Sequence, residues 1–183
     1  MMRKSLSSSL AAFLLAALPL LPLTGCKEDE AASAPPPPRA ITAEAVGHYC
    51  GMTMLDHPGP KGQIVLKGRD RPVWFSSVRD TFAYTMLPEE SHDYRAIYVT
   101  DLEAATDPAH PDLARWTEAR TAWFVVGSGF AGGMGDAEPL PFAGEAAARA
   151  FAASHGGTVK RFEEVTDDYI LAPPAETDTG SAP

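Results

Sequence analysis

Apolar and polar residues alternate in short stretches between residues 60 and 166, and these stretches form two similar series. In the first series, the pattern predicts strands over 63–67 and 72–75, a helix over 78–87 and a strand over 94–100. Val78, Phe82 and Met86 recur every four residues and would form the buried face of the helix, with Ser76 or Ser77 as its N-cap. Met86 is therefore assigned to the core.

The second series repeats this order of elements. Its pattern predicts strands over 121–126 and 139–142, a helix over 144–155 and a strand over 158–165. Gly156 and Gly157 would end the helix, and the prolines of 139–142 are tolerated in a short edge strand. We therefore predict an α+β fold in which two ββαβ units, about 60–101 and 120–166, form one compact pseudo-repeat domain. Residues 102–120 would be an irregular connection.

The first residues of the chain have the pattern of an export signal. Arg3 and Lys4 precede an apolar stretch over 10–23, whose roughly 14 residues are fewer than the ~20 that a transmembrane helix needs. The stretch ends in Leu-Thr-Gly-Cys, which resembles the lipobox of bacterial lipoproteins and makes Cys26 the expected lipid attachment site. An ordinary secretory cleavage site beside a chance cysteine is the alternative.

A lipid anchor at Cys26 would hold the protein to a membrane without crossing it. The anchor and a Pro-rich linker would occupy 26–45, after a signal peptide over 1–25, and a disordered tail over 171–183 would follow a folded domain over 46–170. Lys27 stands where an aspartate would resemble an inner-membrane retention signal. This favours an outer-membrane, periplasm-facing position, where unprotected thiols tend to be oxidised.

The charge of the chain limits its partners. The formal net charge is −9, and it becomes −11 when the signal peptide is removed with Arg3 and Lys4. Nucleic-acid binding needs a basic surface, so this class of function is excluded.

Cys50 is the only cysteine besides Cys26, and its neighbours leave several roles open. A thiol nucleophile needs a base and a group that orients the base; His48 is close in sequence, but no orienting partner can be identified. A dithiol oxidoreductase needs a second free cysteine, which is missing. A buried structural thiol and a soft-metal ligand remain alternatives.

The metal hypothesis uses the methionines near Cys50 and in a later loop. Thiolate and thioether sulfur select Cu(I), and Cys-Gly-Met would place Cys50 and Met52 on the same side of an extended segment. The glycine-rich stretch 127–135 has no Walker lysine, so it is not a phosphate-binding loop. Its large side chain, Met134, is poorly placed for a core residue and could reach Cys50 from the second unit. Zinc would normally need four ligands rich in Cys and His, and no such set is visible.

Several segments together resemble the NosL-type accessory lipoproteins, the copper-binding partners of nitrous oxide reductase. The similar segments are YCGM (49–52), WFSSVRD (74–80), YVTD (98–101), the GGMG loop (132–135) and FAASHGGTVKRFEEV (151–165). The family commonly shows Pro-Met-Gly where this chain has Gly133-Met134-Gly135.

The resemblance implies a fold of two ββαβ units and a chaperone rather than an enzyme. It implies delivery of Cu(I) to the catalytic copper-sulfide centre of nitrous oxide reductase, with membrane-bound copper assembly factors as further partners. Cys50 and Met134 match the family's copper ligands; we expect Met52 as a third donor, with water or His48 as substitutes. Two alternatives stay open: a thiol-dependent periplasmic enzyme that uses Cys50, and an assembly scaffold that binds no metal.

Overall fold

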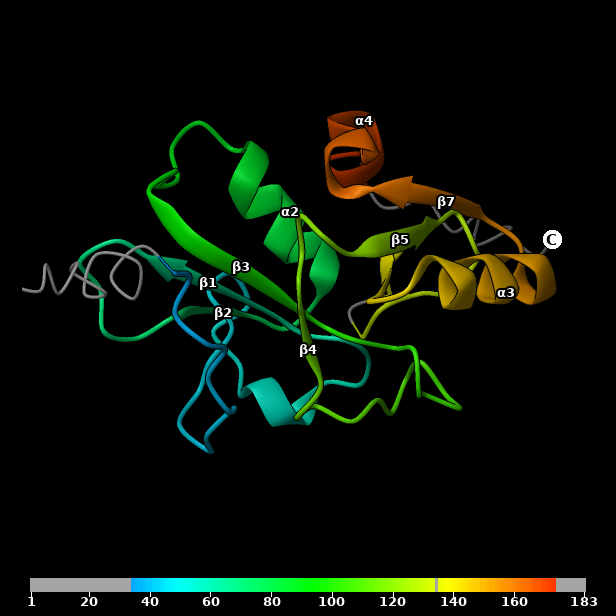
Figure 1. Ribbon diagram of the computed structural model, residues 1–183. Helices are drawn as coiled ribbons and strands as arrows, with labels where there is room; N and C mark the ends of the chain where they lie inside the picture. The colour runs from blue at the N-terminus through cyan, green and yellow to red at the C-terminus, as the bar shows by residue number, and fades with distance from the viewer. Residues whose placement is uncertain (1–33, 134, 174–183) are drawn as a thin grey trace, which may run out of the picture. The chain divides into compact units, whose positions relative to one another are not determined.

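The computed structural model describes residues 34–133 and 135–173 (Figure 1). The predicted signal peptide, Cys26, Met134 and most of the predicted tail lie outside these residues. Within the described ranges, no helix is long and apolar enough to span a membrane.

The first predicted unit is an antiparallel sheet with one helix. It contains β1 (Gly62–Leu66), β2 (Val73–Phe75), α2 (Val78–Met86) and β3 (Tyr94–Thr100). The strand order is β2-β1-β3-β4, where β4 (Trp116–Glu118) is an additional edge strand. Helix α2 packs closely on β1 because Gly62 has no side chain: a Cβ at this position would overlap the side chain of Thr81.

Helix α2 forms as the sequence predicts. The Ser77 hydroxyl accepts a hydrogen bond from the Asp80 backbone N–H at 2.9 Å, which satisfies one of the free donors of the first turn. Val78 and Phe82 are fully buried, and Met86 packs at the margin of the same core. The predicted core role of Met86 is confirmed.

The second unit has the same topology as the first. It contains β5 (Trp123–Val126), β6 (Leu140–Phe142), α3 (Glu145–His155) and β7 (Thr158–Arg161), in the strand order β6-β5-β7. In both units, the first strand is central, pairing with the second strand on one side and the third on the other. The α+β class with two ββαβ units is confirmed.

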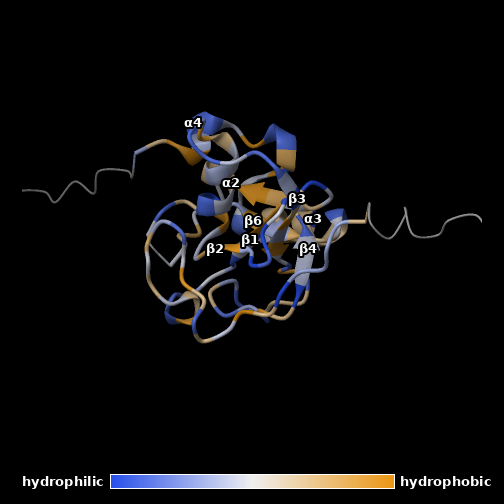
Figure 2. Cartoon of the chain, turned by 90° about the vertical axis from the view of Figure 1, so that its left-hand side faces the viewer, coloured by the Kyte–Doolittle hydropathy of each residue, from blue (hydrophilic) through white to orange (hydrophobic). Residues whose placement is uncertain are grey.

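The second sheet is buried on both faces because apolar residues of β5 point in alternate directions. Phe124 meets Phe82 of α2 at 4.9 Å between ring centroids and belongs to the larger core, while Val125 lies in a smaller core with Leu140 and Ala148 of α3. Figure 2 shows hydrophobic strands at the centre of the domain and hydrophilic residues mainly on helices and loops. Packing across β5 therefore joins the two units.

Three predicted details are wrong. The connection 102–120 is not wholly irregular, because it contains β4, which pairs with β3. The last strand ends at Arg161 rather than 165, and it is followed by the 3-10 helix η2 (Phe162–Glu164) and by α4 (Asp167–Ile170). The strand stops because the Arg161 N–H turns back to the Glu164 carboxylate, while Phe162 stacks on Phe82 at 4.7 Å. The third wrong detail is the extended conformation predicted for the segment around Cys50, which is described in the next subsection.

Residues that precede the predicted domain boundary at residue 46 already pack against the first sheet. The Tyr98 hydroxyl donates to the Pro36 carbonyl at 2.8 Å, and Arg39 exchanges two backbone hydrogen bonds with the Gln63 side chain. The segment leading to Cys50 is therefore fixed along the first sheet.

Candidate metal site around Cys50

The Cys50 segment is a closed loop and not the extended segment that the sequence predicts. The Gly47 N–H donates to the Met52 carbonyl and the Gly51 N–H donates to the Gly47 carbonyl, both at 2.9 Å. Gly51 has a φ of +64°, which a residue with a side chain rarely adopts. The loop leads into the 3-10 helix η1 (Met54–Asp56), in which Met54 is fully buried. The predicted placement of Cys50 and Met52 on one side of an extended segment is therefore wrong, since the chain turns between them.

The Cys50 thiol is half-buried, and Cys50 is the free cysteine within the described residues. Its Sγ lies 3.5 Å from the Ser76 hydroxyl, at the end of β2. Gly47 makes room for the sulfur, because a Cβ on Gly47 would lie only 2.6 Å from Sγ. Met52 is 41 % exposed at the surface of the same loop.

His48 is engaged by another side chain. Its backbone N–H donates to the Trp74 carbonyl at 2.7 Å, which attaches the loop to β2. Its Nε2 lies 3.1 Å from the Glu90 carboxylate, which also accepts a bond from the Tyr49 hydroxyl at 3.0 Å. His48 would have to give up Glu90 in order to bind a metal, which makes it a poorer substitute ligand than the sequence suggests.

Cys50 opens into a cavity that both units share. The cavity, of about 250 Å³, is lined by Tyr49, Cys50, Ser77, Asp80, Gly132, Asp136 and Glu138. Gly132 and Asp136 belong to the connection between β5 and β6, which includes the glycine-rich stretch. Gly133 allows this connection to pack closely against Pro58, because a Cβ at position 133 would lie only 2.7 Å from the Pro58 carbonyl oxygen. The structure therefore brings the glycine-rich loop to the cavity of Cys50, although Met134 itself lies outside the described residues.

Glu138 is a buried carboxyl group at this cavity that sequence reasoning missed. It is 1 % exposed, and its Oε1 accepts hydrogen bonds from the backbone N–H groups of Val78 and Arg79 at the start of α2. Its Oε2 is buried without a hydrogen-bond partner among the described residues and packs against Gly132. Burial raises the pKa of Glu138 to about 8, against the opposing effect of the two backbone N–H groups.

Lys61 is the buried cation of the same region, and it was also missed. Its Nζ donates to the backbone carbonyls of Pro58, Gly59 and Ser76 at 2.9–3.2 Å. Burial lowers the pKa of Lys61 to about 8, while the charges of Glu138 and Cys50 act to raise it. No sequence signal marks either residue, because a single Lys or Glu beside prolines is normally a surface residue.

The cavity is acidic, but its described side chains do not form a ready-made metal site. Asp80, Asp136 and Glu138 make its wall acidic, and burial raises the pKa of Asp80, with Asp136 adding to this effect against the Ser77 hydroxyl. Nevertheless, no group of three or more His, Cys, Asp or Glu side chains in the described part of the chain is arranged to hold a metal ion. A metal site here would depend on the Cys50 sulfur and on thioethers.

Comparison with known proteins agrees with the predicted family. The NosL family model matches residues 38–170. The chain belongs to the NosL family. Two relatives are named copper-binding lipoprotein NosL: one from Achromobacter cycloclastes is 43 % identical over 172 residues, and one from Stutzerimonas stutzeri is 36 % identical over 170 residues. Each alignment covers 93 % of this chain, and they cover 86 % and 87 % of the respective relatives.

A solved NosL structure supports the fold. The crystal structure of the copper chaperone NosL from Shewanella denitrificans is 36 % identical, with a TM-score of 0.65 over 72 % of this chain and 98 % of that one. The names of these NosL proteins describe a binding protein and a chaperone, not an enzyme, as predicted for this chain.

Proposed function

We propose that this protein binds Cu(I) through the Cys50 thiolate, with Met134 and Met52 as thioether donors, and delivers it to nitrous oxide reductase. The observation that carries the proposal is the cavity beside Cys50, whose wall includes Gly132 of the glycine-rich loop of the second unit. The relatives named copper-binding lipoprotein and copper chaperone support copper as the cargo. The recipient would be the catalytic copper-sulfide centre of the reductase, with membrane-bound copper assembly factors taking part.

The site suits binding followed by transfer. Thiolate and thioether are soft ligands that hold Cu(I) at low coordination number. Cys50 is half-buried and Met52 is 41 % exposed, so a ligand from a partner can reach the ion before the outgoing sulfur leaves. Cu(I) replaces the thiol proton, so its binding becomes weaker as the pH falls.

The lipoprotein names of the relatives support a lipid anchor at Cys26. We place the domain on the periplasmic side of the membrane, with the outer membrane favoured by Lys27. The short segment between Cys26 and Pro36, where the chain first contacts the domain, would keep the site within reach of membrane-associated partners and raise its effective concentration there.

The proposal is tested by anaerobic Cu(I) titration of the reduced protein against a chromogenic chelator. We expect Cys50→Ser to weaken binding by about a hundredfold or more, and Met134→Leu and Met52→Leu by roughly tenfold each. Met86→Leu is the matched control, since this methionine packs at the margin of the core and should leave the affinity unchanged. Unchanged affinity in Cys50→Ser would exclude the site.

The alternatives are separated in cells. A thiol-dependent enzyme is disfavoured because His48, the histidine closest to Cys50 in sequence, is bonded to Glu90, and the Cys50 sulfur is bonded to a serine hydroxyl. A scaffold that binds no metal would still support copper-loaded reductase when it carries Cys50→Ser. Our proposal requires the copper content and the activity of the reductase to fall together in that strain.

A further inference from the structure

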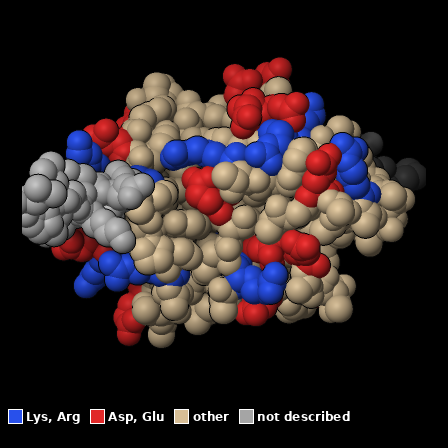
Figure 3. Space-filling model, viewed as in Figure 1, with Lys and Arg blue, Asp and Glu red and all other residues tan. Residues whose placement is uncertain are grey.

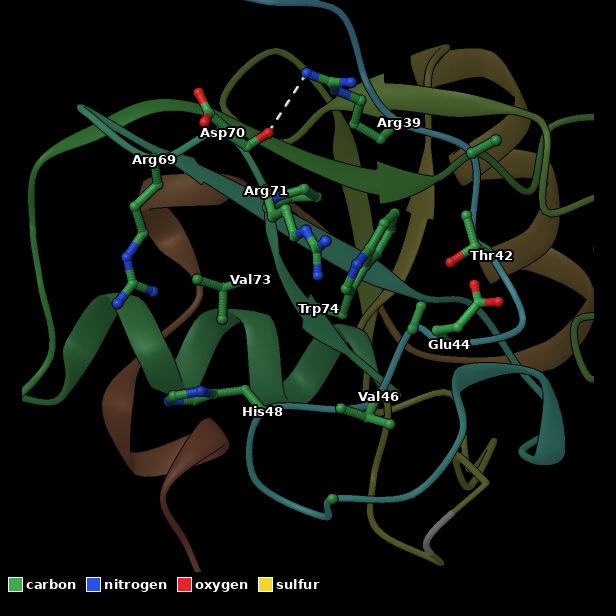
Figure 4. Close-up of a pocket in the computed structure, with 15 residues that line it drawn as sticks. Arg39, Thr42, Glu44, Val46, His48, Arg69, Asp70, Arg71, Val73 and Trp74 are labelled. Carbon is green, nitrogen blue, oxygen red and sulfur yellow. Dashed lines mark hydrogen bonds between the residues drawn. The ribbon is translucent and has the colours of Figure 1, made fainter.

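The loop that carries Cys50 also borders a second hollow. Tyr49 and Cys50 line the cavity described above, whereas Val46, Gly47 and His48 line a separate groove of about 1250 Å³. The opposite wall of the groove is the connection between β1 and β2 together with the start of β2, residues 69–74 (Figure 4). One short loop therefore borders both the thiol and the groove.

Three arginines line this groove. Arg69 and Arg71 come from the β1–β2 connection, and Arg39 comes from the segment that leads into the Cys50 loop (Figure 4). All three are exposed, and Arg39 donates to the Asp70 backbone carbonyl at 3.4 Å. Within the described residues, no ion pair at 4.0 Å or less involves any of the three guanidinium groups.

The groove carries a small excess of positive charge although the whole chain is acidic. The chain has a formal net charge of −9, and acidic and basic side chains are interspersed on the face shown in Figure 3. Two carboxyl groups, those of Glu44 and Asp70, also line the groove, so three positive charges face two negative ones there. The pKa of Glu44 is lowered mainly by a hydrogen bond from backbone N–H, with a smaller contribution from Arg71.

The surface beside the groove is apolar. Four large side chains of the Cys50 loop and its continuation are exposed by 41–53 %: Val46, Tyr49, Met52 and Leu55. Trp74 lines the groove itself. Apolar and aromatic residues at the centre, with arginine around them, are the composition of protein–protein interfaces and of their energetic hot spots.

We propose that this groove binds an acidic, extended segment of the protein that exchanges copper with Cys50. The inference rests on the proposed function and adds the recognition surface to it. Guanidinium groups bind carboxylates through paired hydrogen bonds, so Arg69 and Arg71, which form no ion pair within the described part of the chain, complement a segment rich in Asp and Glu. Val46 and Trp74 would accept its apolar residues. A segment bound there lies against the loop that holds the thiol, which places the partner's own ligands beside Cys50.

An anionic membrane surface is the other partner that these charges could meet. Arg39 lies only 13 positions after the predicted anchor Cys26. The apolar side chains around Cys50 favour a protein partner, because burial of this surface in a membrane would close the copper site to ligand exchange.

The test uses the mature, metal-free protein in detergent and the rhodamine-labelled peptide Glu-Asp-Leu-Glu-Asp-Leu, with binding followed by fluorescence anisotropy. We expect Arg69→Gln/Arg71→Gln to weaken peptide binding by about tenfold or more. The matched control is Arg120→Gln/Arg149→Gln, which removes two exposed arginines that pair with Glu118 and Glu145 outside the groove. It should change binding by less than about twofold. Equal losses in the two double variants, or no binding by the wild type, would overturn the proposal.

Further arms separate the other occupants. Selective loss of binding to phosphatidylglycerol vesicles, with peptide binding retained in Arg69→Gln/Arg71→Gln, would assign the groove to the membrane and refute us. Tighter peptide binding after neutralisation of Glu28, Asp29 and Glu30 would show that the protein's own linker occupies the groove, which also refutes the proposal. Cys50→Ser should bind the peptide normally, and Arg69→Gln/Arg71→Gln should keep its Cu(I) affinity. The Cu(I) titration therefore tests the copper site and the peptide titration tests the groove, so that one proposal can fail while the other stands.

Discussion

Replacement of Glu138 by glutamine should change how the stability of the metal-free protein depends on pH. The pKa of Glu138 rises from an ordinary value of 4.5 to about 8, because the folded protein buries the carboxyl group. Between these values the native state keeps a proton that the unfolded chain has lost, so stability decreases as the pH rises. For one proton, the slope reaches about 1.4 kcal/mol per pH unit, and the loss from about pH 5 to pH 8 approaches roughly 4 kcal/mol.

Lys61 has the opposite effect at higher pH. Its pKa falls from 10.5 to about 8 on folding, so above that value the unfolded chain holds a proton that the native state has released. Stability should therefore increase as the pH rises from about 8 toward 10. The two buried groups together predict a minimum of stability near pH 8.

Urea denaturation of the reduced, metal-free protein between about pH 5.5 and 8 measures this effect. Glu138→Gln keeps an oxygen that can accept from the Val78 N–H but has no proton to release, so its stability should depend less on pH than that of the wild type. Contributions that are common to both proteins cancel in the difference between their profiles. Glu145→Gln, at an exposed residue of α3, should keep the wild-type slope. Parallel profiles for the wild type and Glu138→Gln would refute the reasoning.

Two further substitutions test the packing around the site. Gly47→Ala places a Cβ 2.6 Å from the Cys50 sulfur, so the thiol must move; we expect a loss of about tenfold in Cu(I) affinity in the chelator assay, with unfolding free energy changed by less than ~1 kcal/mol. Unchanged affinity would show that the thiol position is not critical. Ser77→Ala removes the cap that accepts from the Asp80 N–H and should cost about 1 kcal/mol in urea denaturation. Ser91→Ala, at an exposed serine, should cost almost nothing, and an equal loss there would contradict the role of the cap.

The sequence predicts regular elements well where periodicity and local chemistry agree. Helix α2 has both an apolar stripe and a serine cap, and its observed bounds, Val78–Met86, differ from the predicted range by one residue. Strand β3 has the predicted bounds, because its β-branched and aromatic residues favour a strand and it pairs on both sides, with β1 and β4. Strand β4 was missed because three residues, Trp116–Glu118, show no period, and only the free edge of β3 makes them a strand.

The site was less accessible to such reasoning, because long-range contacts create its environment. Cys50 could be selected from its residue type and its neighbours, but the turn at Gly51 depends on backbone bonds that close the loop. Lys61 and Glu138 are charged residues that a sequence pattern assigns to the surface. They are buried because three carbonyls receive the ammonium group and the start of α2 receives the carboxylate.

The pseudo-repeat relates the cavity and the groove that both border the Cys50 loop. In each unit, the connection between the first and second strands approaches the Cys50 loop. In the first unit this connection is 67–72, and it carries Arg69 and Arg71 of the groove; in the second it is 127–139, which carries the glycine-rich stretch and Glu138. The longer connection reaches the start of α2, where Glu138 bonds to Val78 and Gly132 lines the cavity of Cys50. Equivalent positions of the repeat therefore supply different chemistry. Substitutions in the second connection should therefore alter copper binding, and substitutions in the first should alter partner recognition, although both connections border the same Cys50 loop.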